Sequence, residues 1–233
     1  MKSIVRAIVL GTAVCFAIGT PLEGAGTVTV QFDPGTVVTI PTVVGYQPDG
    51  STMAGMKVSA YLADGTSGSV FWSSFGGQSG GAVGTGWSIT ETGDTWSNNW
   101  ALQNNTGQGL LRFTIDGLPG SIVFDTTHGT DTPGSASGLN FSVVSGLGIN
   151  DIVATYKNAC ALPGQLPLED IYGLLDVQFT NPGGFASGQI LTFKADTDVV
   201  PEPGTAALLM LSGATILRRR RWGVHPQRKG VKQ

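Results

Sequence analysis

The sequence LLRFTID at residues 110–116 decides the fold class, because its apolar residues recur at every second position. Leu111, Phe113 and Ile115 alternate with Arg, Thr and Asp, and an Asp-Gly pair ends the run. A period of two places successive side chains on opposite faces of an extended chain, and Asp-Gly is a frequent turn pair. The stretch therefore predicts a β-strand with one face in a core and a tight turn behind it.

The same pattern recurs on both sides of this stretch. TVTVQF at 27–32 and KVSAYLAD at 57–64 alternate in the same way before turn residues. Further alternating runs lie at 122–124, 139–143, 152–156, 175–179 and 190–194. Together with Gly 35 and charged residues at 12%, the runs predict roughly ten to thirteen antiparallel strands and no amphipathic helix. We therefore expect residues 26–198 to form one all-β domain, a two-sheet β-sandwich or jelly roll.

Charge is distributed unevenly along the chain. The span from Glu23 to Glu202 holds all 16 acidic residues, and the basic residues within it are Lys57, Arg112, Lys157 and Lys194. The other basic residues lie at the two ends. An acidic body repels phosphate backbones, so the composition argues against a nucleic-acid partner.

The first 25 residues have the layout of a secretory signal peptide. Lys2 and Arg6 precede an apolar run at 7–18, and small residues follow between Gly19 and Ala25. This order predicts export by the Sec machinery and cleavage by signal peptidase, the alternative being a buried N-terminal helix. Cleavage would leave Cys160 as the one cysteine, which excludes an intramolecular disulfide and favours a buried thiol over a nucleophile.

The C-terminal region has a second apolar segment. Residues 204–217 carry no charge and span about 21 Å as a helix, against about 30 Å for a bilayer core. Arg218, Arg219, Arg220 and Arg221 follow directly, and residues 222–233 form a basic tail. Arginine clusters stay on the cytoplasmic side, so this order predicts a short transmembrane helix with a stop-transfer block and a cytoplasmic tail. The alternative is an apolar strand followed by a basic tail.

The order of Pro201, Glu202 and Pro203, then the apolar segment, then four arginines resembles the PEP-CTERM sorting segment of Gram-negative bacteria over residues 199–221. The resemblance implies an inner-membrane intermediate and processing at the triplet by an exosortase-like membrane peptidase. It also implies a final place at the cell surface, the outer membrane or the extracellular matrix. Two prolines keep the triplet extended and unable to join a helix or sheet, as a peptidase cleft requires. The chain departs from the family pattern in the 12 residues after Arg221 and in the short linker before the triplet.

A looser resemblance concerns Asp170 to Asp198, which is similar to the last hairpin of some bacterial surface domains with interchangeable anchors. It implies a β-sandwich ectodomain and no defined activity.

Four tryptophans lie close together in the sequence: Trp72, Trp87, Trp96 and Trp100. Exposed indoles stack on sugar rings, which would suit a protein that binds extracellular polysaccharide, whereas buried indoles fill a sandwich core. The sequence favours core packing and leaves glycan stacking open.

Two further groups of residues are weak candidates for chemistry. Asp125, His128 and Asp131 could hold a metal, or could belong to a solvated loop, and Asp196 and Asp198 could bind calcium weakly or end a strand. The segment from Gly65 to Gly86 is glycine-rich and predicts a flexible surface loop or a strand pair softened by glycine. Within it, Ser79 lies in a G-x-S-x-G sequence that lacks the helix and the histidine of a hydrolase.

These features predict an exported surface or matrix protein with a structural or adhesive role, no catalytic residues and no cofactor. The first alternative is a carbohydrate-binding module of the polysaccharide matrix. A secreted hydrolase is the minor alternative.

Overall fold

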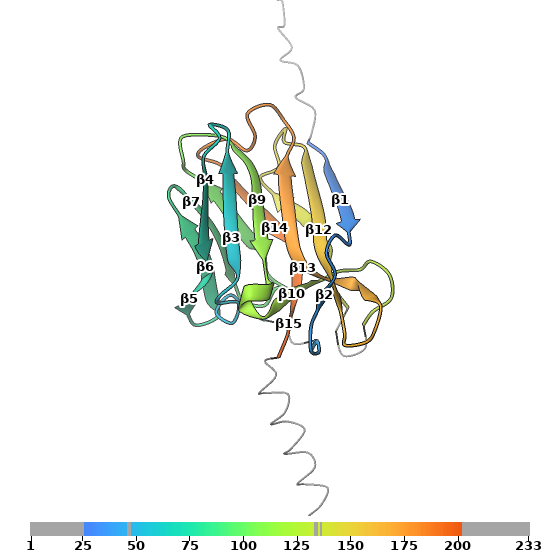
Figure 1. Cartoon of the computed structure of the whole chain (residues 1–233). Coiled ribbons are helices and arrows are strands. Elements are labelled where there is room, and N and C mark those ends of the chain that lie inside the picture. Colours follow the sequence, from blue (N-terminus) through green and yellow to red (C-terminus); the bar gives the residue numbers. More distant parts are fainter. Residues whose placement is uncertain (1–25, 46–47, 133–134, 136, 202–233) are drawn as a thin grey trace, which may run out of the picture.

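The computed structural model describes residues 26–45, 48–132, 135 and 137–201 (Figure 1). This part of the chain is all-β, with fifteen strands and one 3-10 turn, η1 (Leu118–Gly120), and it contains no α-helix. None of its helices could cross a membrane. The signal peptide at 1–25 and the sorting segment from Glu202 onward lie outside the described residues.

The strands form two sheets. The nine-stranded sheet has the order β1-β12-β13-β9-β3-β4, with β10, β15 and β2 attached at its side. Its strands are β1 (Val28–Asp33), β2 (Val38–Thr39), β3 (Lys57–Leu62), β4 (Ser67–Phe71), β9 (Leu110–Asp116), β10 (Ile122–Asp125), β12 (Ile152–Ala161), β13 (Pro167–Phe179) and β15 (Asp196–Val199). The six-stranded sheet has the order β11-β14-β8-β7-β6-β5. Its strands are β5 (Ser73–Gly76), β6 (Ser79–Gly84), β7 (Trp87–Thr92), β8 (Trp100–Asn104), β11 (Ser142–Ser145) and β14 (Ile190–Lys194).

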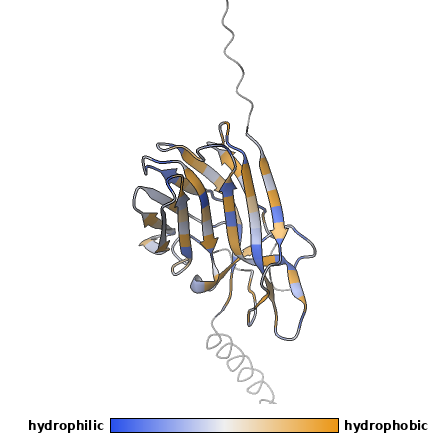
Figure 2. Cartoon of the chain, turned by 45° about the horizontal axis from the view of Figure 1, so that its top comes forward, coloured by the Kyte–Doolittle hydropathy of each residue, from blue (hydrophilic) through white to orange (hydrophobic). Residues whose placement is uncertain are grey.

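The two sheets pack against each other through one apolar core, so the fold is β-sandwich-like. Phe113 on β9 and Phe193 on β14 belong to different sheets, and their ring centroids lie 5.8 Å apart. Apolar and polar residues alternate along the strands in Figure 2, as expected for sheets with one buried face. Burial of these apolar side chains is the main force that holds the sheets together.

The expectation of purely antiparallel pairing is wrong for two strands. β1 and β2 both pair in parallel with β12. Antiparallel pairing is enforced only where a short hairpin joins two strands, and more than a hundred residues separate β1 from β12. The burial of Val30 and Phe32 against the core decides the position of β1 instead.

The strand predicted at 110–116 is present as β9, but Leu111, predicted to face the core, faces solvent. Phe113 and Ile115 are fully buried, whereas Leu111 is 37% exposed and Leu110 takes the core position. The register between β3 and β9 shifts at Leu62, which pairs with Leu110 and leaves Leu111 as an extra residue. Such a bulge reverses the facing of the strand beyond it.

The glycine-rich segment from Gly65 to Gly86 is a set of strands rather than a loop. It contains β4, β5 and β6, so the second of the two expectations is confirmed. Packing explains why residue 80 is a glycine, because a Cβ there would lie 1.8 Å from the carbonyl oxygen of Gly50. Close approach of two backbone segments requires glycine at such a point.

Cys160 belongs to a smaller apolar cluster beside the main core. It packs with Ile40, Val123 and Ile171, and it is fully buried. Burial raises the pKa of its thiol to about 12. The protonated thiol is a small apolar group there, which confirms the expectation of a buried cysteine.

Candidate functional site

Three of the four tryptophans are buried. Trp72 and Trp100 are almost fully buried, Trp87 is 5% exposed, and Trp96 is half-buried. The expectation of core packing is therefore confirmed for the first three. An indole enclosed in this way has no free face to stack on a sugar ring.

Trp72 and Trp100 are structural. The Trp72 Nε1 donates to the carbonyl oxygen of Gly50 at 2.8 Å, and the Trp100 Nε1 donates to that of Ala195 at 2.9 Å. Their rings meet edge to face with centroids 5.2 Å apart. In both indoles the N–H is therefore hydrogen-bonded inside the core.

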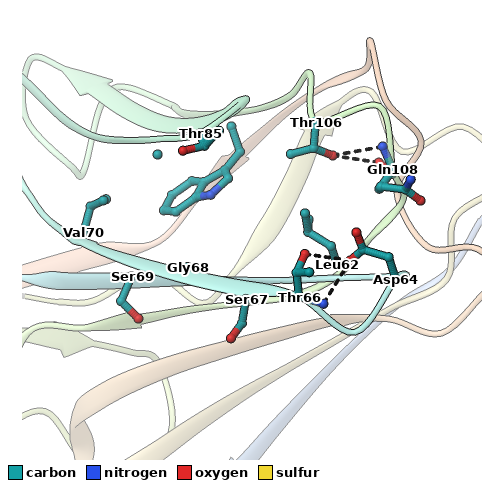
Figure 3. A pocket seen from close by; sticks show the side chains of 12 residues that line it. Leu62, Asp64, Thr66, Ser67, Gly68, Ser69, Val70, Thr85, Thr106 and Gln108 are labelled. Atoms are coloured by element: carbon teal, nitrogen blue, oxygen red, sulfur yellow. Dashed lines mark hydrogen bonds between the residues drawn. The ribbon is translucent and has the colours of Figure 1, made fainter.

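Trp87 differs, because it lines a cleft of about 340 Å³ near the β3–β4 and β6–β7 turns (Figure 3). Its Nε1 makes no hydrogen bond with any described residue, unlike those of Trp72 and Trp100. The ring packs over Gly84, where a Cβ would lie 2.2 Å from the indole. This N–H is not among the fully buried unpartnered atoms, so it is a donor that a molecule in the cleft can reach.

The walls of the cleft are rich in hydroxyl groups. Ser67 and Ser69 come from β4, Thr66 from the turn before it, and Thr85 and Thr106 from the opposite side. In Figure 3, Thr66 Oγ1 donates to Asp64 Oδ1 at 2.6 Å, and Thr106 Oγ1 donates to the Gln108 carbonyl oxygen at 3.0 Å. These bonds fix the positions of the polar groups at the rim.

The cleft lies at the end of the body remote from Pro201. It is beside Leu62, which pairs with the first residue of β9. The other end of β9 leads into η1, and the last described residues lie beside it, because Val200 donates its N–H to the carbonyl oxygen of Ser121 at 2.8 Å. Figure 1 shows the β3–β4 turn at the top and the last described residue at the bottom.

The structure separates the three residues considered as metal ligands. Asp125 is buried at the end of β10, while His128 and Asp131 are exposed. The His128 ring stacks on Phe32 with centroids 4.1 Å apart. In the described ranges no group of three or more His, Cys, Asp or Glu side chains could hold a metal ion.

Asp125 instead faces Asp198 across a shared serine. Ser135 Oγ lies 2.7 Å from Asp125 Oδ2 and 2.5 Å from Asp198 Oδ2. One hydroxyl carries one proton, so it can donate to only one of the two carboxyls, and the other must carry a proton itself to complete the pair of bonds. Burial raises the pKa of Asp125 to about 8 and that of Asp198 to about 7, in agreement with a shared proton.

Asp196 and Asp198 are the first and third residues of β15. Both are buried in β15, and Thr95 donates its hydroxyl to Asp196 Oδ1 at 2.8 Å. The sequence did not reveal this arrangement, because Thr95 is about a hundred residues away. Glu91 is also buried, its carboxyl oxygens have no hydrogen-bond partner among the described residues, and burial raises its pKa to about 8.

Ser79 lies in the wrong setting for a nucleophile. It starts β6 after a β-hairpin turn, and its Oγ is 2.8 Å from the hydroxyl oxygen of Thr92. A nucleophilic serine needs a general base as its hydrogen-bond partner.

The sorting residues fall almost entirely outside the described part. Pro201 is its last residue and is half-buried. Glu202, Pro203 and the arginines at 218–221 lie beyond it. No family model, no curated protein and no solved structure matches the chain. The fold and the cleft therefore define the class on their own: an all-β, sandwich-like protein with a polar cleft at one end.

Proposed function

We propose that this chain is an exported bacterial surface protein, displayed through its C-terminal sorting segment and without enzymatic activity of its own. Residues 1–25 direct it to the Sec machinery and signal peptidase. Residues 199–221 hold it in the inner membrane until an exosortase-like peptidase acts at the triplet. The body then serves as a β-sandwich ectodomain in a structural or adhesive role at the cell surface, in the outer membrane or in the extracellular matrix.

The observation that carries this proposal is the position of Pro201, just after β15, the last described strand. Val199 pairs with Ile122, and Val200 is buried and bonded to Ser121. Pro201 follows directly, so the triplet begins next to the last described strand. Cleavage within or after the triplet would leave every described strand and core side chain in the body, which suits a domain that must survive release from its anchor.

Carbohydrate binding in the matrix is the second candidate. One observation favours it, the hydroxyl-lined cleft beside the unpaired N–H of Trp87. The hydrolase alternative gains no support, since the Ser79 hydroxyl is paired with Thr92.

The proposal is tested by changing Glu202 and Pro203 together to alanine and following the protein in its host. The wild-type chain should become accessible to protease added to intact cells, while the double variant should accumulate at precursor length in the inner membrane. The matched control is Trp222→Ala, which lies beyond the arginine cluster and should behave as wild type. An unchanged destination of the double variant would contradict the proposal.

A further inference from the structure

We propose that the cleft beside Trp87 binds a neutral, hydroxyl-rich sugar unit, with the indole N–H of Trp87 donating a hydrogen bond to it. This inference concerns the ligand of the body and stands on the cleft alone, so it does not depend on the fate of the tail.

The tryptophans differ in whether their indole N–H is bonded inside the protein. Trp72 and Trp100 each donate to a backbone carbonyl, at 2.8 and 2.9 Å, while Trp87 is 5% exposed and donates to no described residue. The Trp87 N–H is not among the fully buried unpartnered atoms, so it is accessible from the cleft. A ligand oxygen in the cleft can accept its hydrogen bond.

Gly68 leaves open space beside the Trp87 N–H. Gly68 lies inside β4 with an ordinary φ, and a Cβ there would meet one atom within 4 Å, the Trp87 Nε1 at 3.9 Å. Neither backbone strain nor crowding therefore requires glycine. A glycine inside a strand weakens it, and often marks a point where a ligand approaches the backbone. Here the open space lies directly above the unpaired N–H.

The charge of the cleft lining favours a neutral ligand. Asp64 is the charged residue of the lining, and the described lining contains no Lys, Arg or His. Hydrogen bonds from Thr66 lower the pKa of Asp64, so its carboxylate is an acceptor at neutral pH. An anionic ligand would be repelled, whereas sugar hydroxyls can donate to Asp64 and accept from Trp87.

The size and position of the cleft agree with this ligand. Its volume of about 340 Å³ lies at the lower end of the range of about 300–1,000 Å³ for small-molecule sites, which fits a short glycan end rather than a long chain. The β3–β4 turn, which supplies Asp64 and Thr66 to the cleft lining, lies at the end of the body opposite the last described residues (Figure 1). A body held through its C-terminus would therefore present the cleft outward.

The test is equilibrium binding of the purified full-length chain in detergent to a panel of neutral monosaccharides and short oligosaccharides. The panel consists of glucose, galactose, mannose, N-acetylglucosamine and their oligomers, with glucuronate as the anionic comparison. Wild type should bind at least one neutral sugar saturably and glucuronate more weakly. No saturable binding to the panel, or tighter binding of glucuronate, would overturn the proposal.

Two variants locate the site. The leucine side chain of Gly68→Leu should fill the cleft and abolish binding. The fold should tolerate the change, because a Cβ at this position would meet no backbone atom within 4 Å. Trp87→Phe keeps an aromatic ring but removes the N–H, so it should weaken binding about three- to tenfold. The matched controls are Ser73→Leu, on exposed β5, and Trp72→Phe, which removes an N–H bonded within the core. Both controls should bind as wild type, and binding that survives Gly68→Leu would place the ligand elsewhere.

Discussion

Arg112 and Asp176 form a bidentate ion pair between β9 and β13. Arg112 Nε lies 2.6 Å from Asp176 Oδ1, and Nη2 lies 2.9 Å from Oδ2. Lys157 Nζ also reaches Oδ2 at 2.9 Å, and the Asp176 side chain is fully buried. Two of the four basic residues of the body thus neutralise one buried carboxylate, which fixes β9, β12 and β13 relative to one another.

Replacement of Asp176 by alanine should lower the free energy of unfolding by about 2–3 kcal/mol. Loss of one partner of a buried pair costs about 3–5 kcal/mol, and the value is reduced here because Arg112 and Lys157 are partly solvated. Urea unfolding of the purified chain measures the change. The exposed Asp131→Ala serves as the control and should change stability by less than about 0.5 kcal/mol. Equal losses in the two variants would contradict a structural role for the ion pair.

The carboxyls joined by Ser135 predict that stability falls as the pH rises. Burial raises the pKa of Asp125 from 3.8 to about 8 and that of Asp198 to about 7. Between pH 4 and pH 8 the folded state therefore binds more protons than the unfolded state, so the free energy of unfolding decreases through this window. Thermal unfolding should give a higher Tm at pH 5 than at pH 9.

The variant Asp125→Asn checks the origin of this slope. Asparagine resembles the protonated carboxyl and does not titrate, so the fall in Tm between pH 5 and pH 9 should become smaller. Asp64→Asn is the control, because the pKa of Asp64 is lowered and its charge does not change in that window. A slope that remains as steep in Asp125→Asn as in wild type would exclude the Ser135 cluster as its source.

Glu91 predicts a second pH effect at higher pH. Its two oxygens bond to no residue that the structure describes, and burial raises its pKa to about 8, so ionisation above that pH places a charge in the interior without a described partner. Glu91→Gln should therefore be close to wild type in Tm at pH 5 and more stable than wild type at pH 9. A variant that is less stable at both pH values would show that the Glu91 carboxyl has a favourable partner.

Cys160 should be inert towards thiol reagents in the folded protein. It is fully buried and its pKa is raised to about 12, while the thiolate is the reactive form. In a chain with Cys15→Ser, labelling of Cys160 should be slow in buffer and complete in denaturant. Rapid labelling of the folded chain would contradict the packing of this cluster.

The sequence predicted the local features of the fold well. The alternation in 110–116 correctly placed Phe113 and Ile115 in the core, because strand periodicity is a short-range property. It misplaced Leu111, since a bulge depends on the partner strand. The parallel position of β1 also depends on a partner more than a hundred residues away.

The candidate site was predicted less well for the same reason. Trp87 was named in the sequence, but its difference from Trp72 lies in an unpaired N–H that only the fold reveals. Gly68 lies between Ser67 and Ser69 inside a strand, where a glycine is unusual. It could not be singled out from the sequence, because the whole segment from Gly65 to Gly86 is rich in glycine. The sequence groups Asp125 with nearby His128, whereas its hydrogen-bond partner is Ser135, which also contacts Asp198 on β15.

The central claim is that this body is exported and then released from its C-terminal anchor. Intact-mass spectrometry of the protein from the surface fraction of its host tests it most directly. The account predicts a chain that begins between Gly19 and Gly26 and ends at or near Pro203, with Arg218–Arg221 absent. A full-length chain that keeps both Met1 and the arginine cluster, or a chain found in the cytoplasm alone, would contradict it.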